Sequence, residues 1–220
     1  MGNRNKAICF FAMEESGAGV SRKRAAGLLS PPGTAKDKRR KIMWYSASYV
    51  SPVGRLLLAS DGEALTGLWL EGQKYYGATL AGEASEGCPA VLETAKAWLD
   101  DYFAGNKPAV SDLPLRPAGS SFRQMIFGIL LEIPYGHTIT YGEIAKKAAA
   151  RMGRPSMSGQ AVGGAVGHNP ISIIIPCHRV VGTGGSLTGY AGGLDKKIWL
   201  LRHEGADMSG LFRPQKGTAL

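Results

Sequence analysis

The sequence predicts an α/β unit followed by a mostly helical unit. Three observations support this order: strand-like runs between residues 45 and 70, an amphipathic helix pattern over 90–103, and capped helix patterns between 121 and 168. A chain of 220 residues has room for one or two compact domains. Its apolar fraction of 44% and charged fraction of 20% are sufficient for a buried core.

The α/β unit begins with three short runs rich in strand-forming residues. They cover Tyr45–Val50, Arg55–Ser60 and Ala64–Leu70. Ser51-Pro-Val-Gly54 and Asp61-Gly62 separate them and are typical of turns. Because the connections are short, we expect an antiparallel meander.

A helix is predicted after the strands, with Pro89 at its start and Gly105 at its end. One face is apolar, with helical spacing: Val91, Leu92, Ala95, Trp98, Leu99, Tyr102 and Phe103. Leu113-Pro-Leu-Arg-Pro117 reads as a linker. We therefore expect an α/β domain over 43–114 and a second domain over 115–207.

The second domain opens with two capped helix patterns. Ser121-x-x-Gln124 is interpreted as a capping box for a helix that ends by Pro134. Thr140-x-x-Glu143 predicts a helix from Tyr141 to about Met152, with Gly153 as its stop.

A third helix, over 158–168, is unusually rich in glycine. Each of its glycines costs about 1 kcal/mol relative to alanine inside a helix: Gly159, Gly163, Gly164 and Gly167. Either the helix packs closely on a neighbouring element, or it presses against a large partner such as a DNA groove. Two capped helices and a small-residue helix fit a helix-turn-helix arrangement.

Candidate chemistry follows an apolar run at Ile171–Pro176, which we interpret as a buried strand. Cys177 comes next, beside His178 and Arg179, where a thiolate can form because proton-accepting and cationic groups are close. The alternative is a small buried apolar residue. We interpret Cys88 in that second way, because no His or Arg lies near it in sequence.

Charge is concentrated at one end of the chain. Residues 1–42 hold ten Lys and Arg against three acidic residues, a net charge of +7, which leaves +2 for the rest. We predict a disordered basic tail there, to which no function is assigned, and a second tail over 208–220. A basic composition alone is therefore no argument for nucleic-acid binding.

Several classes of protein are disfavoured. The three cysteines are widely spaced and odd in number, so a disulfide-stapled secreted scaffold is not expected, and a cytoplasmic location is. No apolar run is long enough for a membrane span. No CxxC or His-x3-His spacing occurs, so no metal is expected.

Five motifs occur in a familiar order. Pro176-Cys-His-Arg-Val180 is preceded by Ala161-Val-Gly-Gly-Ala165 and Asn169-Pro170, and followed by Gly189-Tyr-Ala-Gly-Gly193 and His203-Glu-Gly205. This set resembles the O6-alkylguanine-DNA alkyltransferases over about residues 43–207, most strongly over 121–205. The resemblance implies a ribonuclease H-like antiparallel sheet with a helix, then a mostly α winged-helix-like DNA-binding domain.

The resemblance also implies direct DNA repair. The partner would be double-stranded DNA containing O6-alkylguanine (or O4-alkylthymine), with the damaged base rotated out of the duplex. Cys177 would take the alkyl group in one displacement and keep it as a thioether, so each molecule would act once. No cofactor, no membrane and no oligomer are implied.

Catalytic roles follow position by position from the resemblance. His178 would accept the thiol proton through a water molecule, and Glu204 would orient His178. Asn169 would brace the turn around the cysteine. Tyr141 would help to swing the nucleotide out and donate a proton toward the departing guanine.

DNA and base contacts follow in the same way. Tyr190 and the backbone groups of Val180 and Ala191 would line the base pocket. The helix over 158–168 would lie in the minor groove, with contacts from Gln160, Ala161 and Gly163. Gln160 replaces the arginine that usually fills the gap left by the flipped base, and the connection 146–158 is longer than usual. The zinc ligands of some family members have no counterparts.

Three rival interpretations remain open. The first is a non-catalytic relative that binds the DNA lesion but has lost the cysteine. The presence of Cys177 argues against it. A winged-helix transcription regulator would need only the helices and has no use for the Pro-Cys-His-Arg motif. A cysteine hydrolase would need an oxyanion hole, and only backbone amides could supply one.

Overall fold

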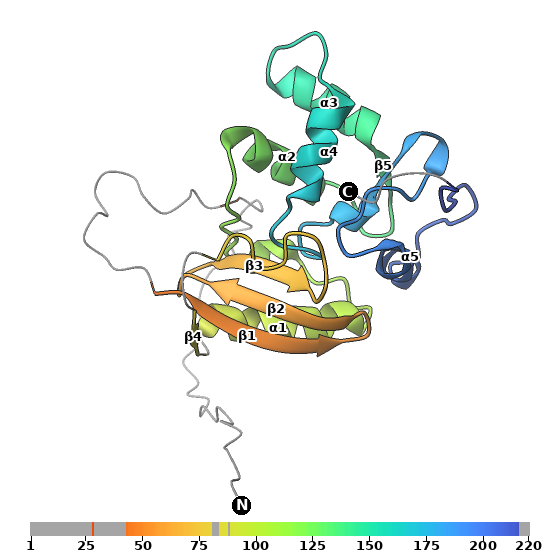
Figure 1. Cartoon of the computed structure of the whole chain (residues 1–220). Helices are drawn as coiled ribbons and strands as arrows, with labels where there is room; N and C mark the ends of the chain where they lie inside the picture. Colours follow the sequence, from red (N-terminus) through yellow and green to blue (C-terminus); the bar gives the residue numbers. More distant parts are fainter. Residues whose placement is uncertain (1–27, 29–42, 81–83, 88, 216–220) are drawn as a thin grey trace, which may run out of the picture.

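The computed structural model describes residues 28, 43–80, 84–87 and 89–215. The predictions for the basic tail, other than at Leu28, and for Cys88 therefore lie outside the described residues. Two units are visible in Figure 1: a small sheet with one helix behind it, and a cluster of helices above and beside its edge.

The sheet has the order β3-β2-β1-β4. β1 (Tyr45–Ser51), β2 (Gly54–Ser60) and β3 (Leu65–Leu70) form the predicted antiparallel meander. The short strand β4 (Ser85–Glu86), which the sequence did not predict, pairs in parallel with β1. Every residue of β3 is buried, because this edge of the sheet faces the helical unit.

Helix α1 (Ala90–Phe103) covers one face of the sheet, as predicted (Figure 1). Its apolar stripe is buried from Val91 to Tyr102. Gly105, with φ of +86°, lies just beyond its end, in a conformation that glycine adopts readily. A 3-10 turn, η1 (Val110–Asp112), leads out of this unit, and Leu113 and Leu115 are buried against it.

The helical unit contains four α-helices and a small parallel strand pair. Helices α2, α3 and α4 pack against one another, and α5 lies apart from them (Figure 1). The pair joins β5 to β6. The bounds are α2 (Ser121–Leu131), β5 (Ile139–Thr140), α3 (Tyr141–Arg151), α4 (Gly159–Gly167), η2 (Cys177–Arg179), β6 (Val180–Val181), η3 (Thr183–Gly185) and α5 (Leu194–His203).

The helix starts confirm one predicted capping box and correct the other. The Thr140 hydroxyl accepts from the Glu143 amide at 3.1 Å, and the Glu143 carboxylate accepts from the Thr140 amide at 2.8 Å. At α2 the cap is instead Ser120, whose hydroxyl accepts from the Arg123 amide. With Ser120 as the cap, Arg123 takes the third helical position, so Ser121 and Gln124 form no box, and the Gln124 side chain donates to the Pro117 carbonyl.

The prediction of a strand over Ile171–Pro176 is wrong, because this segment is a buried turn. Ile173 has φ of +68°, and the Ile175 amide donates to the Ile171 carbonyl. The turn docks on β3, where Leu68 exchanges backbone hydrogen bonds with Pro170 and Ser172. The segment is apolar because both units cover it, and the docking places Cys177 where they meet.

The residues after α5 also pack on the helical unit. Phe212, in the segment predicted as a tail, pairs through its backbone with Gly185 and Leu187. Within the described ranges, no helix has the length and apolar character that a bilayer crossing requires.

Candidate active site

Cys177 begins the 3-10 turn η2 and is only 5% exposed. The Asn169 side-chain amide donates to its sulfur at 3.1 Å. Burial raises the pKa of the Cys177 thiol, and the bond from Asn169 only partly opposes this. The free site therefore holds a protonated thiol, and a base has to remove the proton when the thiol reacts.

Asn169 ties the turn together around the cysteine. Its amide nitrogen donates to the Ile175 carbonyl at 2.8 Å, and its oxygen accepts from the Ile171 amide at 3.0 Å. The same nitrogen contacts the sulfur of Cys177. This arrangement agrees with the bracing role that the family resemblance implies for Asn169.

His178 and Glu204 form a buried pair, with 2.7 Å between Nε2 and Oε1. Burial alone would raise the pKa of Glu204, but His178 and Arg179 outweigh it, so the carboxyl is ionised. Burial lowers the pKa of His178, so its imidazole is neutral at pH 7. With the Nε2 proton donated to Glu204, Nδ1 keeps a lone pair, and Nδ1 has no partner among the described residues.

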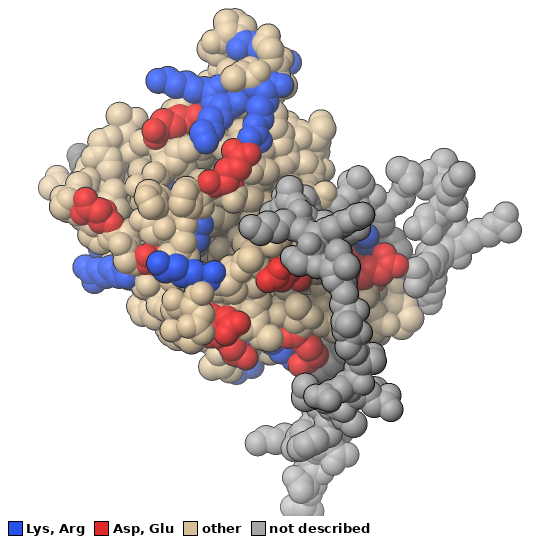
Figure 2. Space-filling view, turned by 180° about the vertical axis from the view of Figure 1, so that it is seen from behind, with Lys and Arg blue, Asp and Glu red and all other residues tan. Residues whose placement is uncertain are grey.

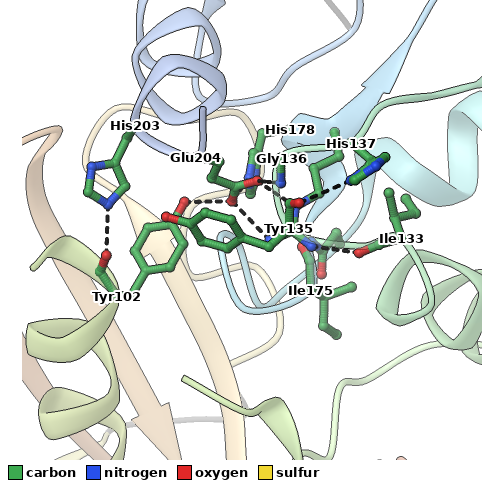
Figure 3. Close-up of polar contacts among 11 residues, drawn as sticks. Tyr102, Ile133, Tyr135, Gly136, His137, Ile175, His178, His203 and Glu204 are labelled. Atoms are coloured by element: carbon green, nitrogen blue, oxygen red, sulfur yellow. Dashed lines mark hydrogen bonds and ion pairs between the residues drawn. The ribbon is translucent and has the colours of Figure 1, made fainter. Parts of the chain in front are cut away.

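Glu204 accepts from three further groups that the sequence analysis did not assign to the site (Figure 3). Arg179 donates from Nε to Oε2 at 2.7 Å and from Nη2 to Oε1 at 2.9 Å. The Tyr102 hydroxyl donates to Oε1 at 2.8 Å, and the Gly136 amide to Oε2 at 3.2 Å. Only the position of Arg179 next to His178 could have indicated any of them.

Lys197 is a further residue of the site that the sequence analysis did not predict. Its ammonium is fully buried and donates to the Val180 carbonyl at 2.6 Å and the Thr188 carbonyl at 2.8 Å. Burial lowers the pKa of Lys197 to about 8, while its interaction with Cys177 acts in the opposite direction. Among the described residues it has no ion-pair partner, and Cys177 is the group whose negative charge acts on its pKa.

The two predicted tyrosines, Tyr141 and Tyr190, lie close enough to Cys177 for its charge to contribute to their raised pKa values. The Tyr141 hydroxyl donates to the Gly189 carbonyl at 3.0 Å, and burial raises its pKa. The Tyr190 hydroxyl is buried without a partner among the described residues, and its ring meets His178 edge-on at 6.4 Å between centroids. The Ala191 carbonyl accepts from the Lys74 amide of the α/β unit.

The predicted DNA-contacting residues lie on α4. Gln160 and Ala161 are exposed, and Gly163 is half-buried. A Cβ built on Gly159 or Gly164 would meet nothing within 4 Å, and one on Gly163 would only reach the Tyr141 ring at 4.0 Å. Internal packing therefore does not account for Gly159, Gly163 and Gly164, whereas Gly167 is buried.

Basic side chains gather at the end of the molecule where α3 lies (Figure 2). The exposed ones on α3 and the following loop are Lys146, Lys147, Arg151 and Arg154. Lys147 and Arg151 pair with Glu132. Over the described ranges, no group of three or more His, Cys, Asp or Glu could hold a metal ion.

Comparison with known proteins identifies both units. Residues 44–117 match the model for the 6-O-methylguanine DNA methyltransferase ribonuclease-like domain, and residues 121–206 match the model for the DNA binding domain of the same enzymes.

Three similar proteins match this chain over most of their own length. A methylated-DNA–protein-cysteine methyltransferase of Haemophilus influenzae is 44% identical over 73% of this chain and 86% of its own. One from Methanosarcina acetivorans is 44% identical over 74% of this chain and 99% of its own. The crystal structure of Mycobacterium tuberculosis OGT in complex with DNA is 40% identical, with a TM-score of 0.62 over 74% of this chain and 92% of that one.

These matches agree with the five motifs and with a cysteine held beside a histidine–glutamate pair. The chain therefore belongs to the methylated-DNA–protein-cysteine methyltransferases, which carry out direct DNA repair by alkyl transfer to cysteine.

Proposed function

We propose that this protein removes an alkyl group from O6-alkylguanine in double-stranded DNA and keeps it on Cys177. The observation that supports this most directly is the order of groups at the site. Asn169 contacts the sulfur, while His178, held by Glu204, presents an unpartnered Nδ1. A neutral imidazole with a free lone pair is the form that can accept a thiol proton.

In the proposed step, the Cys177 proton passes through a water molecule to His178 Nδ1. The sulfur then forms a bond to the alkyl carbon as the bond from that carbon to O6 breaks, and the electron pair of that bond stays with guanine. Tyr141 gives a proton to the departing guanine and recovers one from the relay. Overall the thiol proton ends on guanine and the sulfur carries the alkyl group.

The product is a thioether, which water does not readily hydrolyse. No other described cysteine is available to accept the group. We therefore propose that each molecule acts once and is consumed. A thiol that must stay reduced suits a reducing compartment, so we assign the protein to the cytoplasm.

The DNA-facing element in this proposal is α4. Its open glycines allow close approach by a nucleic-acid backbone, and exposed Gln160 lies in its first turn. We propose that α4 enters the minor groove, that the damaged nucleotide rotates out toward Tyr190, and that Gln160 fills the gap. One molecule suffices for one lesion, so we propose that it acts as a monomer.

The test is a stoichiometry assay with a duplex oligonucleotide that contains O6-methylguanine. We expect one methyl group per molecule, located on Cys177 by mass spectrometry, and none on a Cys177→Ala variant that still binds the duplex. Binding without transfer by the natural chain would support a lesion-binding protein instead. Repeated turnover on esters or amides would support a hydrolase.

A further inference from the structure

Beyond the residues that the family motifs assign, one side chain of the α/β unit reaches the proton relay. Tyr102 lies near the end of α1, and its side chain is 1% exposed. Its hydroxyl donates to Glu204 Oε1 at 2.8 Å, the same oxygen that accepts from His178 Nε2 at 2.7 Å. Figure 3 shows Tyr102, which comes from α1 of the α/β unit, directed at the Glu204 carboxylate.

Tyr102 is held firmly in this position. Its ring stacks on Trp98 at 5.4 Å between centroids and meets Phe103 edge-on at 5.1 Å. Its backbone carbonyl accepts from His203 Nε2 at 2.7 Å. Because His203 immediately precedes Glu204, the bonds from the Tyr102 hydroxyl to Glu204 and from His203 to the Tyr102 carbonyl fix the end of α1 to the end of α5. The Tyr102 hydroxyl is thereby oriented toward Glu204.

The shared oxygen makes the hydroxyl more than a structural contact. Arg179 Nη2 is a third donor to Oε1, at 2.9 Å, and Arg179 and Lys197 are the two cations that act on His178. Each donor to Oε1 draws negative charge from the carboxylate, so Tyr102 and Arg179 both compete with His178 for that charge. With Tyr102 present, Glu204 attracts the Nε2 proton of His178 less strongly and stabilises an imidazolium less. The hydroxyl therefore limits the basicity of Nδ1 as well as the orientation of the ring.

We propose that Tyr102 is a positioning residue of the relay and that, through Glu204, it sets the basicity of His178. This rests on the proposed function for its role in transfer, although the effect on His178 is a property of the free protein. In consequence the α/β unit takes part in the chemistry and is not only a scaffold.

The test compares the natural chain with Tyr102→Phe, which keeps the ring and loses only the hydroxyl. Without DNA, the titration of His178 is followed by NMR, with its signals assigned from a His178→Asn variant. We expect the His178 midpoint to rise by roughly half a pH unit or more when the hydroxyl is removed. The low-pH limb of methyl transfer should move in the same direction.

Tyr49→Phe is the matched control. The Tyr49 hydroxyl also donates to a carboxylate of the same unit, Asp100 Oδ1 at 2.7 Å, but away from the site. We expect this variant to leave the His178 titration unchanged. A Tyr102→Phe protein with an unshifted His178 midpoint would overturn the proposal, even if transfer were slower, because slower transfer alone would indicate a merely structural role.

The two proposals can fail separately. If the natural chain does not methylate Cys177, the proposed function is wrong, and the NMR titration still decides whether Tyr102 acts on His178. In a double-mutant cycle, Tyr102→Phe should shift the His178 titration much less in a Glu204→Gln background, because the shared carboxylate is gone. An equal shift in both backgrounds would show that the effect does not pass through Glu204.

Discussion

At the scale of single residues, burial shifts the pKa values of the nucleophile Cys177 and its base His178 in opposite directions. Burial raises the pKa of Cys177 and lowers the pKa of His178, so both are neutral at pH 7. We expect iodoacetamide to modify free Cys177 slowly at pH 7 and faster as the pH rises past the usual thiol range, because only the thiolate reacts. Mass spectrometry of the Cys177 peptide measures this. Fast modification that is level from pH 6 to 8 would contradict the prediction.

Methyl transfer should have a different pH dependence. It requires His178 to be neutral, and a lowered pKa keeps it neutral at pH values below its usual midpoint of about 6.5. We therefore expect single-turnover transfer to lose half its rate only below pH 6.5. A half-loss at or above pH 6.5 would show that burial does not govern this group.

Glu204 also compensates a cation. Glu204→Gln should slow transfer by about 100-fold or more, because His178 loses the charge that stabilises its protonated form. It should also lower the free energy of unfolding by about 3 kcal/mol, because Arg179, which is nearly buried, loses its counter-charge. Urea unfolding measures this. Adding Arg179→Met should recover part of the stability and none of the activity, whereas recovered activity would exclude a catalytic role for the carboxylate.

Gln160 stands where the family resemblance implies an arginine that fills the gap left by the flipped base. Arginine carries charge and stacks better than glutamine, so it should fill the vacated base position more effectively. We expect Gln160→Arg to transfer methyl groups faster from duplex DNA and equally fast from the free base. Equal rates on duplex DNA would refute the idea that Gln160 limits base extrusion.

At the scale of elements, one substitution in α4 should raise the stability of the protein and weaken its binding to DNA. A Cβ on Gly164 meets open space, so Gly164→Ala should stabilise the protein by about 1 kcal/mol. The same methyl group should weaken duplex binding if α4 presses into a groove. Gly128→Ala in α2, where a Cβ has ordinary contacts, is the control for helix stabilisation without loss of binding. Tighter binding by Gly164→Ala would place the DNA elsewhere.

Most helices and strands were predictable from local sequence patterns, and the two errors occur where no such pattern exists. Strand-forming runs bounded by turns predicted β1 to β3, and an apolar stripe at helical spacing predicted α1. Start and stop signals predicted α2 and α3, and the small-residue segment over 158–168 predicted α4. The run Ile171–Pro176 was misread because a long apolar run has no period that separates a strand from a turn buried on both sides. The two-residue strand β4 is too short to leave a pattern.

At the scale of the whole molecule, the parts of the site that escaped prediction are those that folding brings together. Cys177, His178 and Asn169 are close in sequence, and the resemblance supplied Glu204. Tyr102, however, comes from another unit, and nothing local marks it. The contact between the units, with Leu68 paired to the turn before Cys177, is the reason that α1 can reach Glu204.

The distribution of charge over the molecule gives a last prediction. Beyond residue 42 the net charge is only +2, so attraction to DNA depends on where the cations lie. Lys146 and Arg154, on the basic end seen in Figure 2, have no ion pair among the described residues, while Lys147 is paired with Glu132. If Lys146 and Arg154 contact phosphates, the log of the DNA-binding constant should fall less steeply with log salt in the double variant Lys146→Gln, Arg154→Gln. The magnitude of the slope should decrease by nearly 2, because each lost contact removes about 0.9. Lys196→Gln, at a half-buried lysine of α5 that donates to the Glu71 carbonyl, is the control. An unchanged slope in the double variant would show that the DNA lies away from α3, since counterion release reports only phosphates that the protein neutralises.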